Sequence, residues 1–207
     1  MTALIDYDAG NMRSVEKALK ALGDSPVVTR DRETILRADR VILPGVGAFR
    51  DCRNNLDRYG LSPVIREVAG RGTPFLGICV GMQLLFESSE EGMELNGGQP
   101  VQGLGIFPGR VRKLPEEAGL KIPHMGWNSL KIAPNTRLFR GIPGESYVYF
   151  VHSYCAFAEG RAFEAAETEY GARVLASVER DNVFATQFHP EKSSETGLRI
   201  LKNFLEM

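Results

Sequence analysis

Residues that commonly carry reactivity are scarce in this chain. Its 207 residues include 3 cysteines, 3 histidines and 1 tryptophan. Cys52, Cys79 and Cys155 are an odd number in a chain too long to need disulfide bonds for stability, so we expect free thiols. No two of the cysteines and histidines have the close spacing of a metal-ligand pair. The sequence therefore predicts no metal site.

An excess of charge and a long hydrophobic run are lacking as well. Lysine and arginine total 25 against 26 acidic residues, which excludes the basic surface of a general nucleic-acid binder. The longest nearly apolar run, residues 75–86, is shorter than the ~18 residues that suggest a membrane span. No basic region precedes the apolar residues at the N-terminus, so no signal peptide is expected. We therefore expect a cytoplasmic protein without a nucleic-acid or membrane partner.

The first half of the chain alternates short apolar strands with helices. The expected strands are 2–6, 27–29, 41–43 and 74–79. Helices are expected over 11–22, from an N-cap at Ser62 and Pro63 onward, and after residue 79 through 84–86. Because such strands are buried on both faces, they predict an α/β fold with a mostly parallel, doubly wound, flavodoxin-like sheet.

The second half is instead rich in strands. Expected strands cover 110–114, 129–132, 147–154, 164–169, 176–180 and 183–188, with a hairpin turn at Asp181-Asn182. We interpret them as antiparallel additions to the parallel sheet. A last helix begins at a cap formed by Ser193 and Ser194. No linker or repeat divides the sequence, so we expect a single domain over residues 1–207.

A possible nucleophile stands where the strand 74–79 meets the next helix. Residues 77–81 read Gly-Ile-Cys-Val-Gly, the cysteine form of the Gly-x-Ser-x-Gly nucleophile elbow. A side chain held on so sharp a turn crowds the positions two residues away, which explains both glycines. Since the helix begins at Cys79, its N-terminus stabilises a thiolate. Cys79 as a small buried hydrophobic residue is the alternative, and the paired glycines favour the nucleophile.

His189 is the best candidate for the base that a thiol nucleophile needs. It ends a strand and precedes Pro190 and Glu191. In extended backbone, residues two apart point the same way, so Glu191 is expected beside the imidazole with Pro190 excluding a helix there. A histidine beside a surface acid is the alternative. His124 and His152 are then structural or interface residues.

Two backbone donors are needed for a tetrahedral intermediate. The N–H of Val80 follows the nucleophile, and Gly45, Val46 and Gly47 form a turn after the strand 41–43 that can supply the second. This turn lacks the sequence of a P-loop or a dinucleotide fingerprint, so no cofactor is expected, and a simple sharp turn remains the alternative. Gln83, one helical turn after Cys79, either contacts a polar substrate or satisfies a buried backbone group.

The elbow, Gln83 and the segment 187–191, Gln-Phe-His-Pro-Glu, resemble the class I glutamine amidotransferases. Segments 6–11, 123–128 and 189–193 are similar to the glutaminase subunits of imidazole glycerol phosphate synthases, and the likeness extends over nearly the whole chain. The resemblance implies hydrolysis of glutamine to glutamate and ammonia through a thioester. It also implies transfer of the ammonia to a (β/α)₈-barrel cyclase partner in histidine biosynthesis.

The resemblance also implies roles for single residues. Cys79 is expected to attack the glutamine amide, His189 to protonate the departing ammonia and Glu191 to position His189. Gln83 and the turn Gly45 to Gly47 are expected to contact glutamine. The remaining implied contacts are Ser153 and Tyr154 for glutamine, and Asn11, Trp127 and Lys192 for the partner.

Two positions depart from the family pattern. Asp8 stands where glycine is usual, and the turn is expected to persist because Asp tolerates left-handed backbone. Cys155 stands where tyrosine is frequent. Two other functions remain open at this point. One is a cysteine hydrolase of γ-glutamyl compounds or the glutaminase of another synthase. The other is a binding subunit that has lost catalysis.

Overall fold

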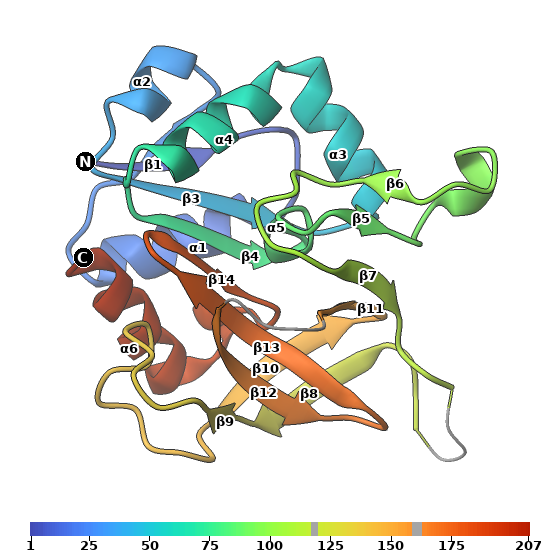
Figure 1. Cartoon of the computed structure of the whole chain (residues 1–207). Coiled ribbons are helices and arrows are strands. Elements are labelled where there is room, and N and C mark those ends of the chain that lie inside the picture. Colours follow the sequence, from blue (N-terminus) through green and yellow to red (C-terminus); the bar gives the residue numbers. More distant parts are fainter. Residues whose placement is uncertain (117–119, 159–162) are drawn as a thin grey trace.

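One mixed sheet of eight strands runs through the molecule (Figure 1). The structure, a computed structural model, describes residues 1–116, 120–158 and 163–207. The strand order is β2-β1-β3-β4-β14-β13-β12-β9. The five strands from β2 to β14 are mutually parallel, and the pairs from β14 to β9 are antiparallel. The predicted mostly parallel, doubly wound sheet is therefore confirmed.

The strands of this sheet are short, and β1, β3, β4 and β14 are buried as expected. The expected burial of the strand 27–29 on both faces is wrong, because β2 is an edge strand with exposed side chains. Their bounds are β1 Thr2–Ile5, β2 Val27–Thr29, β3 Arg40–Gly45, β4 Phe75–Cys79, β9 Lys131–Ile132, β12 Glu164–Glu169, β13 Arg173–Arg180 and β14 Val183–Thr186. β14 is the last strand of the chain, yet it pairs in parallel with β4, from Val183 opposite Phe75 to Thr186 opposite Ile78. This pairing brings residues that follow β14 to the same sheet edge as residues that follow β4.

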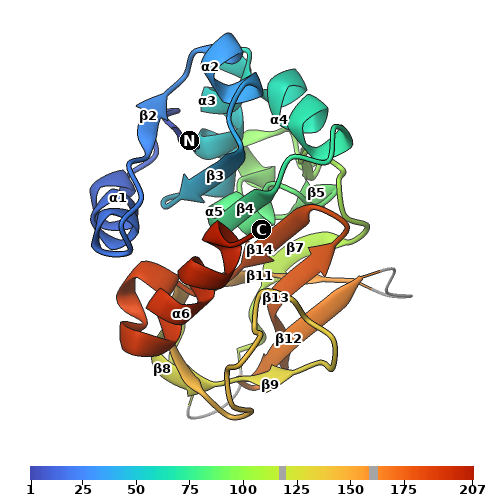
Figure 2. The same cartoon turned by 90° about the vertical axis from the view of Figure 1, so that its left-hand side faces the viewer.

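Helices cover both faces of the parallel strands (Figures 1 and 2). α1 (Met12–Ala21) and α6 (Ser194–Leu205) lie on one face, and α2 (Arg32–Leu36), α3 (Phe49–Arg58) and α4 (Leu61–Gly70) lie on the other. The predicted helix 11–22 is confirmed as α1, which buries Val15, Ala18 and Leu19 at helical spacing.

The predicted start of α4 at Ser62 is wrong. α3 was not predicted, and α4 begins at Leu61, directly after Gly60. Gly60 has a φ of 65° and donates its N–H to the Asp57 carbonyl, so the chain turns from α3 into α4 without a linker. The Ser62 hydroxyl therefore lies inside α4 and donates to the Asp57 carboxylate instead of capping a helix.

The predicted helix through residues 84–86 is also wrong. α5 covers only Val80–Gln83. The carbonyl groups of Leu84, Leu85 and Phe86 accept hydrogen bonds from backbone N–H groups of the segment 104–107 instead of continuing a helix. Two short elements follow in this region, η1 (Met93–Leu95) and β6 (Val101–Gln102). Tertiary partners thus end α5 after one turn.

Only part of the second half joins the large sheet. The hairpin between β13 and β14 at Asp181 is confirmed, as are β12 and β13 as antiparallel additions. β9, the end of the expected strand 129–132, also joins this sheet in antiparallel pairing with β12. The expected strand 183–188 is β14, which is antiparallel to β13 but parallel to β4, so it is only in part an antiparallel addition. The expected strands 110–114 and 147–154 instead lie in two smaller sheets, one of β8 with β10 and one in the order β11-β7-β5-β6. Their bounds are β5 Ser88–Ser89, β7 Arg110–Lys113, β8 His124–Ser129, β10 Tyr147–His152 and β11 Tyr154–Phe157. The expected strand 147–154 is divided at Ser153, because β10 and β11 pair with different partners.

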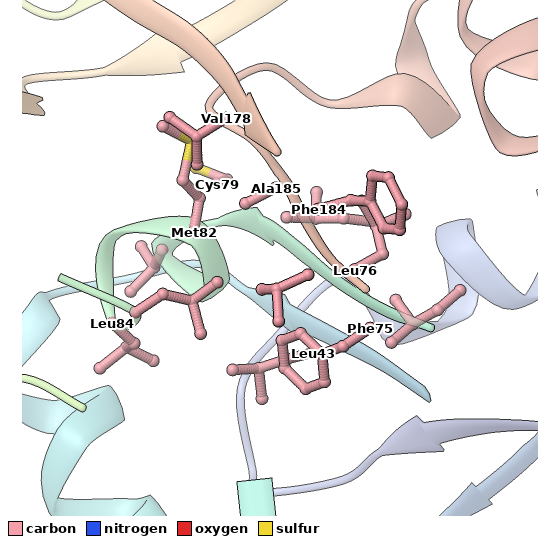
Figure 3. Packing of buried hydrophobic residues seen from close by; sticks show 14 of the residues in the cluster. Leu43, Phe75, Leu76, Cys79, Met82, Leu84, Val178, Phe184 and Ala185 are labelled. Atoms are coloured by element: carbon pink, nitrogen blue, oxygen red, sulfur yellow. The ribbon is translucent and has the colours of Figure 1, made fainter. Parts of the chain in front are cut away.

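The main hydrophobic core lies around β4 and β14. Figure 3 shows Leu76, Phe184 and Ala185 among its packed side chains. The same cluster includes buried residues of the helices on both faces, such as Ile65 of α4 and Leu201 of α6. A single domain over residues 1–207 agrees with this shared core and stays a prediction. Within the described residues, none of the helices has the length and apolar character needed to cross a membrane.

Candidate active site

Cys79 occupies a strained turn between β4 and α5. Its φ of 54° and ψ of −110° are unusual for a residue with a side chain. A Cβ atom on Gly81 would lie 2.0 Å from the Leu43 carbonyl oxygen, and one on Gly77 would lie 2.8 Å from the Gly81 oxygen. Both flanking glycines are thus required, because the turn brings β4, α5 and β3 into direct backbone contact.

The turn after β3 packs against the start of α5. A Cβ atom on Gly45 would lie 2.7 Å from the Gly81 nitrogen and 2.6 Å from the Tyr7 hydroxyl oxygen. The Tyr7 hydroxyl donates to the Pro44 carbonyl at 2.6 Å, and the Cys52 thiol donates to the Val46 carbonyl at 3.5 Å. The turn that is predicted to supply an oxyanion donor is therefore held by Tyr7 at Pro44 and by Cys52 at Val46.

His189 and Glu191 form a buried pair beside Cys79. Nδ1 of His189 lies 2.7 Å from Oε1 of Glu191, and their side chains are 1% and 0% exposed. The predicted contact is present, although its backbone explanation is wrong. His189 is extended, but Pro190 begins the 3₁₀ helix η2 (Pro190–Lys192) instead of excluding a helix. Proline fits the first position of a helix, where its missing N–H costs nothing.

The backbone of His189 is fixed to β10 at two points. Its N–H donates to the Tyr149 carbonyl at 3.0 Å. The Ser193 hydroxyl donates to the His189 carbonyl at 2.7 Å and accepts from the Tyr149 N–H at 2.9 Å. Ser193 does precede α6, but its side chain makes no capping hydrogen bond, so this part of the cap prediction is wrong. The hydroxyl instead connects η2 to β10.

The electrostatics of the site favour a protonated His189. Burial by itself would lower the pKa of this imidazole, but the neighbouring Cys79 thiol and the Glu191 carboxylate raise it to about 10. Within the described part of the chain, the Nε2 atom of His189 is buried without a hydrogen-bond partner. An imidazolium between a sulfur and a carboxylate is suited to stabilise a thiolate and to deliver a proton.

A cavity of about 250 Å³ lies beside Cys79 and His189. Its lining consists of Val46, Gly47, Cys79, Val80, Gln83, Glu91, Val151, His152, Ser153, Tyr154 and His189. Six residues predicted to contact substrate are therefore collected around one space with Cys79 and His189. Gly45 and Glu191 lie behind that lining, where they support Val80 and His189. The roles of all these residues stay predictions.

The Gln83 amide already has two protein partners. Its Nε2 donates to the Tyr154 carbonyl at 2.9 Å and to Oε1 of Gln187 at 3.1 Å. Of the two alternatives for Gln83, satisfaction of a buried backbone group is thus observed, while the side chain still lines the cavity.

Two residues with a place in this site were missed. Nε2 of Gln187 donates to the Cys79 sulfur at 3.7 Å. The Glu91 carboxylate lines the cavity and accepts from the Phe49 N–H at 2.8 Å, at the start of α3, and burial raises its pKa. Gln187 had a signal, its place beside His189, whereas Glu91 lies in a loop without a recognisable pattern.

The three predicted partner contacts lie outside the cavity. Asn11 donates from Nδ2 to Oε1 of Glu191 at 2.5 Å, behind the His189 pair. Trp127 of β8 is 52% exposed and makes an edge-to-face contact with Tyr149. Lys192 is an exposed residue of η2. Their contacts with a partner stay predictions.

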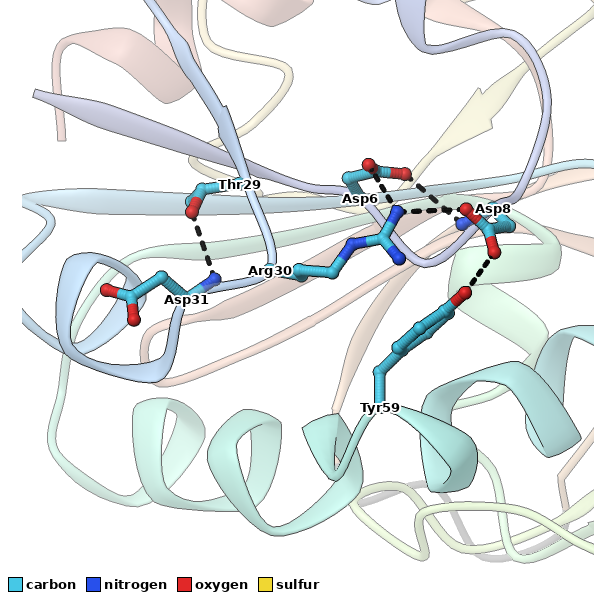
Figure 4. A network of polar contacts seen from close by, with 6 residues as sticks. All are labelled: Asp6, Asp8, Thr29, Arg30, Asp31 and Tyr59. Atoms are coloured by element: carbon cyan, nitrogen blue, oxygen red, sulfur yellow. Dashed lines mark hydrogen bonds and ion pairs between the residues drawn. The ribbon is translucent and has the colours of Figure 1, made fainter.

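The segment before Asn11 is held by a polar network, which Figure 4 shows. Nη2 of Arg30 donates to Asp6 at 2.6 Å and to Asp8 at 2.9 Å, and the Tyr59 hydroxyl donates to Asp8. Asp8 has a φ of 61°, as expected for a turn that usually holds glycine. The two hydrogen bonds to its carboxylate help to offset the strain of this backbone conformation. The other departure, Cys155, is fully buried.

Residues 3–207 match the family model described as glutamine amidotransferase class-I. The chain belongs to the class I glutamine amidotransferase family. Within this family it also belongs to the HisH subunits. It is 53% identical over 205 residues to the imidazole glycerol phosphate synthase subunit HisH of Moorella thermoacetica, covering 99% of this chain and 94% of that protein. It is 52% identical over 207 residues to HisH of Caldanaerobacter subterraneus subsp. tengcongensis, covering 100% of this chain and 98% of the relative.

Solved structures of amidotransferases share the fold. One described as glutamine amidotransferase aligns with a TM-score of 0.74 at 22% identity, covering 99% of this chain and 97% of the other. PurLQS from Thermotoga maritima aligns with a TM-score of 0.74 at 20% identity and the same coverage. At these identities the likeness supports the fold, while the HisH relatives define the branch of the family.

Proposed function

We propose that this chain hydrolyses L-glutamine through Cys79, His189 and Glu191, as the glutaminase subunit of an imidazole glycerol phosphate synthase. The observation that carries the proposal is the meeting of the Cys79 elbow with the buried His189–Glu191 pair at one cavity. The strained backbone of Cys79 adds support, because such strain concentrates at functional sites.

In the proposed reaction, the Cys79 thiolate attacks the side-chain amide carbon of glutamine. The protonated His189 gives its proton to the amide nitrogen, so ammonia leaves and a γ-glutamyl thioester remains. His189 then takes a proton from water, and the resulting hydroxide attacks the thioester. The γ-carboxylic acid of glutamate leaves and loses its proton to solvent, so the Cys79 thiolate and the protonated His189 are both restored. Glu191 keeps the imidazole in the orientation that both steps need.

Charge complementarity suggests how glutamine lies in the cavity. The Glu91 carboxylate is a negative group at its wall and is suited to the α-ammonium of the substrate. In this proposed pose the N–H of Val80 and a backbone N–H of the turn at Val46 and Gly47 donate to the oxygen of the tetrahedral intermediate. Ser153 and Tyr154 complete the proposed substrate contacts on the opposite strand segment.

The proposed partner is a (β/α)₈-barrel cyclase that uses the ammonia, in a heterodimer in the cytoplasm. The names of the HisH relatives support an assembly of subunits. Free buried cysteines agree with a reducing compartment. The exposed side chains of Met125, Trp127 and Tyr147 on β8 and β10 offer an apolar surface for the contact.

Replacement of the nucleophile tests the proposal. In the complex with the cyclase, Cys79→Ala should lower glutamine hydrolysis at least ~100-fold, since the variant lacks the sulfur that is proposed to form the thioester. The cyclase should still turn over when ammonium salt replaces glutamine. Glutamine hydrolysis by Cys79→Ala at the wild-type rate would overturn the assignment.

Cys52 provides a control, because it is buried nearby but its thiol donates to the Val46 carbonyl. Cys52→Ser preserves a donor and should keep most of the activity. If Cys52→Ser loses activity as completely as Cys79→Ala, the wrong thiol has been chosen.

A further inference from the structure

A row of hydrogen bonds joins β8 to the wall of the cavity. Nδ2 of Asn128 lies 3.3 Å from Nε2 of His124. Nδ1 of His124 lies 3.0 Å from Nε2 of His152, and Nδ1 of His152 lies 2.9 Å from the Tyr154 carbonyl oxygen. His152 and Tyr154 line the cavity, whereas His124 and Asn128 do not. The three side chains of this row, those of Asn128, His124 and His152, have no part in the proposed chemistry.

The end at Asn128 fixes the direction of this row. The Oδ1 atom of Asn128 accepts from the Ser129 N–H at 2.9 Å, and its Nδ2 donates to the Glu169 carbonyl at 3.0 Å. These backbone partners decide which atom of the amide is nitrogen. Nδ2 therefore donates to His124, whose Nε2 must be the acceptor. A neutral imidazole that accepts at Nε2 carries its proton on Nδ1.

The opposite end gives the same direction independently. The Tyr154 carbonyl can only accept, so His152 carries its proton on Nδ1 and accepts at Nε2. The donor toward His152 must then be Nδ1 of His124. Both ends thus require the same tautomer, with the proton on Nδ1, in both histidines.

The Tyr154 carbonyl continues the connection to the nucleophile. It also accepts from Nε2 of Gln83, whose second hydrogen goes to Oε1 of Gln187 at 3.1 Å. Because Oε1 of Gln187 is an acceptor here, its Nε2 is the group that faces the Cys79 sulfur at 3.7 Å. The orientation of a donor at the sulfur is therefore tied to the position of one carbonyl group.

We propose that His124 and His152, both protonated on Nδ1 only, are positioning residues that hold the Tyr154 carbonyl in place. Through this carbonyl they fix the cavity wall at Tyr154 and the orientation of the Gln83 and Gln187 amides. His124 faces inward on β8, and the exposed Met125 and Trp127 alternate with it on the outer face of the same strand. β8 thus presents the apolar surface on its outer face and, through His124 on its inner face, supports the cavity wall.

The surroundings keep both histidines neutral. His124 is 3% exposed and stacks between Phe150 and Tyr170, with ring centroids at 4.6 and 3.9 Å. Burial lowers the pKa of His124 to about 4. Burial, with a smaller contribution from His124, lowers the pKa of His152 to about 3. At neutral pH each imidazole therefore carries a single N–H proton, and its hydrogen-bond partners determine which ring nitrogen bears it.

Nitrogen-15 NMR of the full chain tests the tautomers directly. At pH 7, two of the three histidines should show the spectrum of the Nδ1-protonated neutral ring, and His124→Asn should remove one of these two signals. A neutral ring protonated on Nε2 at either His124 or His152 would overturn the proposal. This measurement does not depend on any enzymatic activity.

Two variants of His124 then test the positioning role. This second experiment rests on the proposed function, because it measures glutamine hydrolysis. In His124→Asn the amide nitrogen can replace Nδ1 as the donor to His152, whereas His124→Leu has a similar size and no donor. In the cyclase complex, His124→Leu should raise the KM for glutamine at least ~3-fold with a smaller change in kcat, and His124→Asn should stay within ~2-fold of wild type.

Equal KM values for the two variants would overturn the positioning role, even if both are less stable than wild type. A wild-type complex that fails to hydrolyse glutamine would contradict the proposed function instead, and the NMR result would still decide whether the hydrogen-bond row exists.

Discussion

Asn11 and His189 share one oxygen of Glu191. Oε1 of this buried carboxylate lies 2.7 Å from Nδ1 of His189 and accepts from Nδ2 of Asn11 at 2.5 Å. Asn11 stands at the N-terminus of α1, 180 residues before Glu191. The other oxygen, Oε2, is buried and has no hydrogen-bond partner within the described residues. Asn11 thus supports the orientation of the carboxylate that holds the histidine.

Removal of this donor should weaken catalysis. Asn11→Ala leaves the buried Glu191 carboxylate with less support, which typically costs about 1–3 kcal/mol. We expect kcat for glutamine to fall about 5-fold to 100-fold in the cyclase complex, with a smaller change in KM. Arg13→Ala, on the exposed part of α1, is the control. Unchanged kcat in Asn11→Ala would show that Glu191 is held without this hydrogen bond.

The glycines of the elbow should differ in a predictable order. Gly81→Ala places a Cβ 2.0 Å from a backbone oxygen, Gly77→Ala places one at 2.8 Å, and Gly70→Ala meets nothing within 4 Å. Urea unfolding should show a loss of about 3 kcal/mol or more for Gly81→Ala and a smaller loss for Gly77→Ala. Gly70→Ala, at the end of α4, should be neutral or stabilising. A tolerated Gly81→Ala would contradict the close approach of α5 to β3.

Acid should destabilise the fold because His124 and His152 are buried as neutral rings. The pKa values of about 4 for His124 and about 3 for His152 lie below the usual 6.5. Below pH 6.5 the two histidines therefore bind protons in the unfolded chain while they stay neutral in the folded chain. As the pH falls from 6.5 toward 4, the free energy of unfolding therefore decreases by up to about 1.4 kcal/mol per pH unit for each histidine.

The variant His124→Asn removes one of these two contributions. Between pH 7 and pH 5, its loss of unfolding free energy in urea should be about 2 kcal/mol smaller than that of wild type. Carboxylates that titrate in the same range contribute equally to both proteins and cancel in the difference. An identical loss in the two proteins would show that His124 takes up protons as readily in the folded state as in the unfolded state.

Lys192 should matter for the proposed partner and not for the fold. It is exposed on η2, next to Glu191 in the sequence. If its ammonium pairs with a carboxylate of the cyclase, Lys192→Ala removes a partly desolvated ion pair, which costs about 2–5 kcal/mol. We expect cyclase binding to weaken by at least ~30-fold, since each 1.4 kcal/mol is a factor of about ten, and the melting temperature of the isolated chain to stay unchanged. Lys202→Ala, exposed on α6, should leave binding unchanged.

Local chain chemistry explains which predictions were right. The elbow at Cys79, the glycines around it and the hairpin at Asp181 depend on residues a few positions apart, and all three were recognised. The same local reasoning failed for the helix after Gln83, because carbonyls of residues 84–86 bond to the segment 104–107. It also failed for the strand 147–154, whose two halves pair with β8 and β7. Such partners are too distant for a local pattern to predict.

The sequence by itself determined the chemical groups of this protein: a cysteine on a glycine-flanked turn, and a histidine two residues before a glutamate. Tertiary structure alone decided that these groups meet, because β14 pairs with β4 although about a hundred residues separate them. It also placed Gln187 at the Cys79 sulfur, Glu91 in the cavity wall and Asn11 on Glu191. The Gln187 contact joins the segments that follow the neighbouring strands β14 and β4. The other two contacts join segments that are not neighbours in the sheet order, so they depend on how helices, loops and the smaller sheets pack around it. Both arrangements are set by long-range packing that no short stretch of sequence contains.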